Sequence, residues 1–125
     1  MSSPDVLIID DDAIIRQVAK LHLERAGYSV SLASGGTAGL AAARAHPPRV
    51  ILLDFSMPDL SGVDVLRALK ASETTAAIPV LMITAWRAEA DRAESEALGA
   101  RWLSKPILGD TLIDAVRTTL RCGAV

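Results

Sequence analysis

Several polar side chains follow runs of apolar residues at widely separated places in the sequence, and together they could transfer a phosphoryl group. Carboxylate oxygens suit Mg²⁺, which binds one or two protein carboxylates and keeps waters that a phosphate can replace. A carboxylate can also attack phosphorus, while an ammonium and a hydroxyl stabilise the charge on the transferred oxygens. In chain order, the candidates are Asp10, Asp11, Asp12, Asp54, Thr84 and Lys105.

Each of these motifs also has an ordinary structural explanation when it is taken alone. Three aspartates after a strand are more often a solvated helix start, and Asp12 in particular suits an N-cap or a first helical turn. Asp54 could begin a turn, threonine is common at strand ends, and Lys105-Pro106 could be an exposed turn. The chemical interpretation therefore depends on the elements that bring these residues together.

Short apolar runs predict the strands of a parallel sheet. Val6–Ile9, Val50–Leu53 and Pro79–Ile83 are apolar at consecutive positions, which is typical of strands buried on both faces. Tyr28–Ala33 alternates apolar residues with serine and predicts a half-exposed edge strand. Arg101–Ser104 is a weaker candidate, also at an edge.

Helical periodicity fills the gaps between these strands. The first helix is marked by Ile14, Ile15, Val18, Leu21 and Leu23 and is stopped by Gly27. The expected helices span about 13–26, 37–45, 62–71, 88–98 and 108–120. The fold class is therefore α/β: a doubly wound, flavodoxin-like (βα)5 domain with a five-stranded parallel sheet of order 2-1-3-4-5 and helices on both faces.

This topology brings the candidate residues to one rim. Ligands bind such sheets outside the carboxyl ends of the strands, at the point where the strand order reverses. That point lies between the first and third strands, where Asp10, Asp11 and Asp54 are expected. Thr84 and Lys105 end the fourth and fifth strands at the same rim. The conjunction favours phosphoryl transfer to Asp54 in the presence of Mg²⁺.

Length and composition limit the remaining possibilities. The 125 residues predict one domain over 1–125, with a core of about 5–121 and no output domain. A net charge of -2 without a basic patch argues against direct binding to nucleic acid or to an anionic membrane. The chain has a single cysteine, Cys122, and lacks a signal peptide or a bilayer-length apolar run, so a cytoplasmic location is expected.

A glycine-rich segment, Ser34–Gly39, resembles a phosphate-binding loop but lacks the lysine that ends a P-loop and the spacing of a dinucleotide-binding fingerprint. It also follows an edge strand rather than a central one. We interpret it as the flexible start of a helix.

The chain resembles the receiver domains of bacterial two-component response regulators, in the single-domain form typified by chemotaxis regulators. The resemblance extends from Val6 to Leu120. Its motifs are Ile8-Ile9-Asp10-Asp11, Leu52-Leu53-Asp54 through Pro58 with Gly62, Ile83-Thr84-Ala85, and Lys105-Pro106.

The resemblance implies a role for each matching residue. Asp54 would accept the phosphoryl group, with Asp11 as a direct Mg²⁺ ligand and Asp10 acting mainly through water. The backbone carbonyl of Ser56 would be a third protein ligand. Lys105 would contact the phosphoryl group, and the Thr84 hydroxyl would move toward it. Trp102 occupies the switch position at which the family usually has Tyr or Phe, although packing against the sheet edge explains this residue equally well.

The resemblance also implies partners. A phosphohistidine on a sensor histidine kinase or a histidine phosphotransfer protein would supply the phosphoryl group. A downstream protein would bind the face formed by the helix at 88–98, the strand at 101–104 and the last helix. The chain would be a monomer or weak dimer that catalyses its own phosphorylation and dephosphorylation without turning over a substrate. It could be a complete regulator or a receiver from a larger protein.

Two other functions fit some of the residues. A phosphohydrolase of the haloacid-dehalogenase type has an Asp-x-Asp pair after its first strand, and Asp10 and Asp12 have that spacing. Asp54 would then be unexplained, and the chain is short for such an enzyme. A degenerate receiver that only binds a partner is disfavoured because each residue of the phosphorylation site is present.

Overall fold

Consecutive leucine and β-branched residues form the centre of a parallel sheet. The computed structural model describes residues 4–54, 60–84, 101–104 and 109–123. The sheet has the order β2-β1-β3-β4-β5, and every neighbouring pair is parallel, as the sequence predicted. Its strands are β1 (Val6–Ile9), β2 (Val30–Ala33), β3 (Val50–Asp54), β4 (Val80–Thr84) and β5 (Arg101–Ser104).

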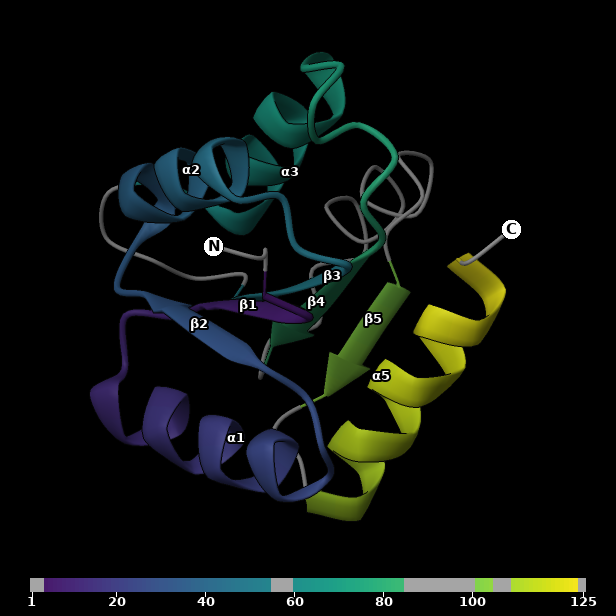
Figure 1. Cartoon of the computed structure of the whole chain (residues 1–125). Helices are drawn as coiled ribbons and strands as arrows, with labels where there is room; N and C mark the ends of the chain where they lie inside the picture. The colour runs from purple at the N-terminus through teal and green to yellow at the C-terminus, as the bar shows by residue number, and fades with distance from the viewer. Residues whose placement is uncertain (1–3, 55–59, 85–100, 105–108, 124–125) are drawn as a thin grey trace.

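Helices cover both faces of the sheet. Those in the described residues are α1 (Ala13–Arg25), α2 (Gly36–Ala45), α3 (Gly62–Ala71) and α5 (Gly109–Gly123). α2 and α3 lie on one face, and α1 and α5 lie on the other (Figure 1). The doubly wound prediction is confirmed for these elements, whereas the helix expected at 88–98 lies outside the described residues. No helix in the described part of the chain is long and apolar enough to cross a membrane.

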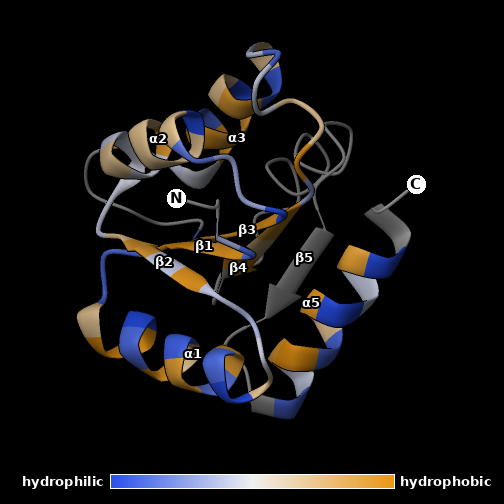
Figure 2. Cartoon of the chain, in the orientation of Figure 1, coloured by the Kyte–Doolittle hydropathy of each residue, from blue (hydrophilic) through white to orange (hydrophobic). Residues whose placement is uncertain are grey.

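Two apolar layers fill the space between the sheet and its helices. Because successive side chains of a strand point to opposite faces, Leu7 and Ile9 pack toward α2 and α3, whereas Val6 and Ile8 pack toward α1 and α5. Figure 2 shows the resulting concentration of hydrophobic residues along the central strands. All of β1 and β3 is buried, which explains why their sequences are apolar at consecutive positions.

α1 ends as its sequence predicts, but several of its apolar residues face solvent rather than the core. Gly27 has a φ of 98°, the left-handed conformation that glycine adopts without a Cβ clash, and the Tyr28 N–H donates to the Leu23 carbonyl at 3.0 Å. Leu23 is fully buried, but Ile14, Val18 and Leu21 are exposed to solvent. The apolar residues that marked this helix therefore lie on more than its core face.

Candidate functional site

The strand register places the predicted carboxylates side by side. Ile9 at the end of β1 pairs with Leu53 in β3, so the next residues, Asp10 and Asp54, lie at the same level on adjacent central strands. The Asp10 N–H extends the ladder by donating to the Ala33 carbonyl of β2 at 3.1 Å. The crossover between β1 and β3 is the point at which the strand order reverses, where ligands of this fold class bind.

Three carboxylates form a tight cluster at this point. Asp10, Asp11 and Asp54 each contribute an oxygen, and these oxygens lie within 4.8 Å of one another. Asp10 and Asp54 are buried, at 3% and 5% exposed, while Asp11 is exposed. Like charges held this close repel one another, and burial of two of them increases the cost. A bound cation would remove that cost.

The donor set fits a hard divalent cation. All three side chains offer carboxylate oxygens, which are the ligands preferred by Mg²⁺. One exposed and two buried ligands would leave a coordinated ion open toward solvent on the Asp11 side. Such an arrangement suits a cation that keeps waters for a phosphate to replace.

Asp12 has a different role from its two neighbours. Its Oδ1 accepts hydrogen bonds from the Ile14 N–H at 2.9 Å and the Ile15 N–H at 3.3 Å, so it is the N-cap of α1. Its own N–H donates to Asp10 Oδ1 at 2.9 Å. The N-cap prediction is confirmed. Because its carboxylate caps the helix, Asp12 is poorly placed to act as the second member of an Asp-x-Asp hydrolase pair.

The other predicted site residues are described in part or not at all. Thr84 is the last residue of β4 and pairs in register with Ser104, the last residue of β5. Trp102 is the second residue of β5 and pairs with Met82. Only their backbone positions are described. Ser56 and Lys105 lie outside the described residues.

The glycines after β2 form the start of α2, as the sequence predicted, and two of them are also needed for close packing. A Cβ on Gly39 would lie 2.5 Å from Ile9 Cδ1, and a Cβ on Gly36 would lie 2.7 Å from Leu60 Cβ. Both glycines lie within α2, where they let the helix backbone approach its neighbours. Gly39 thus seats α2 against the residue that precedes Asp10. The sequence signal was their spacing of three, which puts both on one helix face.

Comparison with known proteins agrees with this fold. A family model described as "Response regulator receiver domain" matches residues 6–117. The chain belongs to this family of two-component systems, whose members are signalling domains rather than classical enzymes. The match favours the receiver over the phosphohydrolase alternative.

Individual relatives include both longer and similarly short proteins. The chain is 40% identical over 119 residues to the DNA-binding dual master transcriptional regulator RpaA of Synechocystis, covering 94% of this chain and 49% of that protein. It is 35% identical over 116 residues to protein PilH of Pseudomonas aeruginosa, covering 92% of this chain and 96% of that protein. The chain thus spans about half the length of several curated relatives it matches.

Solved structures show the same fold. The chemotaxis protein CheY4 of Vibrio cholerae superposes with a TM-score of 0.86 at 32% identity, covering 95% of this chain and 98% of that one. A CheY-like receiver domain protein from Methanospirillum hungatei gives a TM-score of 0.90 at 27% identity, covering 98% of each chain.

Proposed function

We propose that this chain is a phosphorylation-activated receiver that accepts a phosphoryl group on Asp54 with the help of Mg²⁺ and signals through protein–protein contacts. The observation that carries the proposal is the cluster of Asp10, Asp11 and Asp54 oxygens within 4.8 Å at the switch point of the sheet. Family membership supports the same function.

Asp54 is the best candidate for the nucleophile because of its position in the cluster. It is the last residue of β3, which lies in the middle of the sheet between β1 and β4, and it is buried. Because β1 and β4 flank β3, the backbone that carries the Asp54 carboxylate is held in place for attack. Asp11, in contrast, is exposed and follows the end of its strand.

Asp10, Asp11 and Asp54 would hold the Mg²⁺, together with the backbone carbonyl of Ser56. The bound ion would neutralise these carboxylates and the charge on the oxygens of the transferred phosphoryl group. An oxygen of Asp54 then forms a bond to phosphorus as the P–N bond of a phosphohistidine breaks and the imidazole leaves. Later attack of water on the aspartyl phosphate returns the free carboxylate and inorganic phosphate.

Thr84, Lys105 and Trp102 complete the proposal. Support comes from the strand register, because Thr84 pairs with Ser104 and Lys105 follows directly. Lys105 would offset charge on the phosphoryl oxygens, and the Thr84 hydroxyl would donate a hydrogen bond to one of them. Trp102 would respond to the movement of Thr84.

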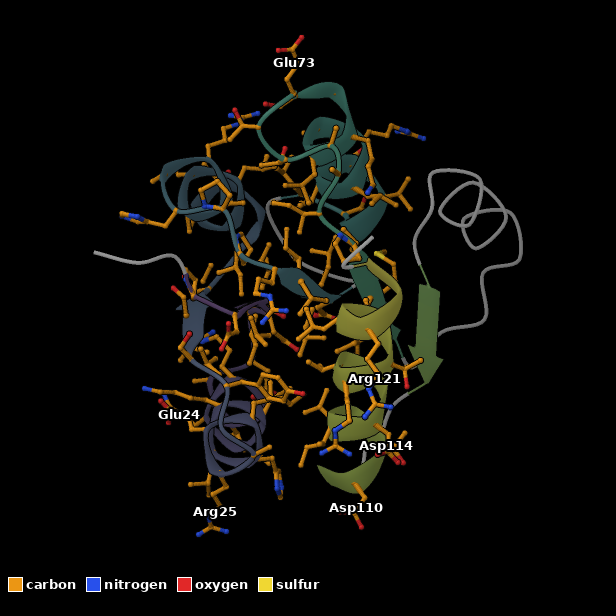
Figure 3. The ribbon with its side chains drawn as sticks, turned by 45° about the vertical axis from the view of Figure 1, so that its right-hand side comes forward. Glu24, Arg25, Glu73, Asp110, Asp114 and Arg121 are labelled. Atoms are coloured by element: carbon orange, nitrogen blue, oxygen red, sulfur yellow. The ribbon has the colours of Figure 1, made fainter. Side chains whose placement is uncertain are left out.

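An apolar stripe on α1 supports a protein as the phosphoryl donor. Ile14, Val18 and Leu21 are 74%, 49% and 48% exposed and are spaced four and three residues apart, so they share one helix face. At 100° per residue this face lies opposite the buried Leu23. Figure 3 shows Arg25, one turn further along the same face, pointing away from the molecule.

The apolar stripe lies close enough to the carboxylates to bind the protein that donates the phosphoryl group. It begins two residues after the Asp12 cap, at the rim that carries the carboxylates, and extends about 10 Å along the helix. Exposed apolar residues that adjoin one another are typical of a protein interface. A kinase or phosphotransfer protein bound here would hold its phosphohistidine next to Asp54.

The output and the setting of this receiver remain proposals drawn from the family. We propose that a downstream protein binds the face that includes β5 and α5, and that the chain acts in the cytoplasm as a monomer or weak dimer. Direct contact with nucleic acid or a membrane is not expected, because the chain has a net charge of -2.

Phosphate stoichiometry tests the proposal. The purified protein is incubated with Mg²⁺ and a small acyl phosphate donor, and both incorporated and released phosphate are measured. We expect at most about one phosphoryl group per chain, lost in Asp54→Asn and after chelation. Rapid multiple turnover that persists in Asp54→Asn would refute the receiver function and return the phosphohydrolase alternative.

A further inference from the structure

A cationic side chain reaches back to the carboxylate cluster from the first turn of α1. Arg16 Nη1 donates a hydrogen bond of 2.7 Å to the backbone carbonyl of Asp10. The Arg16 N–H donates to the Asp12 carbonyl at 3.0 Å, so its backbone belongs to the first hydrogen-bonded turn. Side chains of a helix point toward its N-terminus, which explains how Arg16 reaches a residue six positions earlier.

The carbonyl that Arg16 binds belongs to the peptide joining two of the clustered aspartates. Other groups of Asp10 are already held: its N–H bonds the Ala33 carbonyl, and its Oδ1 accepts the Asp12 N–H. Arg16 adds a contact to the carbonyl, beyond the last residue of β1. Rotation of this peptide would change the direction of the Asp11 side chain. The hydrogen bond from the guanidinium therefore limits how the Asp10 and Asp11 side chains can turn relative to each other.

We infer that Arg16 is a positioning residue that orients the Asp10–Asp11 peptide so that both carboxylates face Asp54 and a bound cation. This inference rests on the proposed function, because it assumes that the cluster binds Mg²⁺. Hydrogen-bond partners behind metal ligands commonly contribute about 10- to 100-fold to metal affinity.

The charge of Arg16 would act in the opposite direction to its positioning effect. A guanidinium beside the cluster repels an incoming cation, so removing the charge alone would tighten Mg²⁺ binding. The sign of the change therefore separates the two roles. A role confined to folding would alter stability without changing Mg²⁺ affinity.

Mg²⁺ titration of the purified protein by calorimetry, with urea unfolding in parallel, tests the inference. We expect Arg16→Gln to weaken Mg²⁺ binding about tenfold and Arg16→Lys, which keeps the charge and one donor, to weaken it less. Arg25→Gln is the matched control, since it removes the same charge from the exposed far end of the same helix. Its Mg²⁺ affinity should equal that of the wild type.

The outcomes distinguish this inference from the proposed function. Equal Mg²⁺ affinity in Arg16→Gln and Arg25→Gln, or tighter binding in Arg16→Gln, would overturn the positioning role while leaving the receiver function intact. Absence of Mg²⁺ binding by the wild-type chain would overturn both. If Arg16→Gln does not fold, unchanged affinity in a folded Arg16→Lys variant would overturn the inference.

Discussion

Replacing Asp54 with asparagine should stabilise the metal-free protein, because it removes one charge from a crowded cluster. Two unit charges 4.8 Å apart repel by about 3.5 kcal/mol at an effective dielectric of about 20, and by about 0.9 kcal/mol in water. Asp54 has two such neighbours. Asp10 is buried, which strengthens its repulsion, whereas Asp11 is exposed and screened by solvent.

The net gain should be smaller than the sum of these repulsions. Asp54 takes part in other interactions in the folded protein, which asparagine need not reproduce, and the Arg16 guanidinium bound at Asp10 reduces the repulsion. We therefore expect Asp54→Asn to raise the free energy of unfolding by about 1–3 kcal/mol. Urea unfolding in the presence of a chelator measures this difference.

Mg²⁺ should narrow or reverse the difference in unfolding free energy between Asp54→Asn and the wild type. Binding to the native state stabilises the wild type according to the ratio of free Mg²⁺ to its dissociation constant, and Asp54→Asn loses one ligand. Asp114→Asn is the control because this carboxylate is exposed and pairs at 3.6 Å with Arg117, which is itself about half exposed. That control should change stability by less than about 0.5 kcal/mol. Destabilisation by Asp54→Asn in chelator would refute the reasoning.

Three further predictions concern the donor surface, the packing beneath the site and the half-buried amine of Lys70. Val18→Glu should slow phosphorylation by a partner kinase roughly tenfold while leaving the rate with a small acyl phosphate unchanged. Ala41→Glu is its control, because it adds the same charge at an exposed position of α2, on the other face of the sheet. Equal effects of Val18→Glu on both donors would contradict docking on α1. Gly39→Ala should lower the free energy of unfolding by about 1–3 kcal/mol because the added Cβ would overlap Ile9, and this cost exceeds a gain in helix propensity of about 1 kcal/mol. Greater resistance of Gly39→Ala to urea would contradict the close packing of α2 on Ile9. Burial lowers the pKa of the Lys70 amine, which donates hydrogen bonds to two backbone carbonyls. Between this folded pKa and the unfolded value of 10.5 the unfolded chain binds more protons, so the free energy of unfolding of the wild type should rise with pH relative to Lys70→Met. Parallel pH profiles of the two proteins would contradict this prediction.

The sheet and the carboxylate cluster could be predicted because the strands show as short apolar runs in the sequence and the strand order then places their ends. Apolar residues at every position identified the buried central strands, and the edge strands followed from weaker patterns. Once the strand order was known, the strand ends had to meet at one rim, so Asp10, Asp11 and Asp54 came together without any contact being assumed. Asp12 followed from its place before a helix.

Features that depend on tertiary packing were not predictable in the same way. The apolar residues of α1 recur on several faces, so periodicity alone could not separate the buried Leu23 from the exposed Val18. The need for Gly39 arises from the side chain of Ile9, which is thirty residues earlier. The contact of Arg16 depends on its side chain folding back toward the N-terminus of the helix, and a sequence pattern does not specify that rotamer.

The location of the phosphoryl group after phosphorylation tests the central claim most directly. Borohydride reduces an aspartyl phosphate to homoserine, and mass spectrometry of the peptides then identifies the modified residue. After incubation with Mg²⁺ and a phosphoryl donor, we predict homoserine at position 54 and none in Asp54→Asn. Modification at Asp10, Asp11 or Asp12 instead, or equal labelling in Asp54→Asn, would contradict the account.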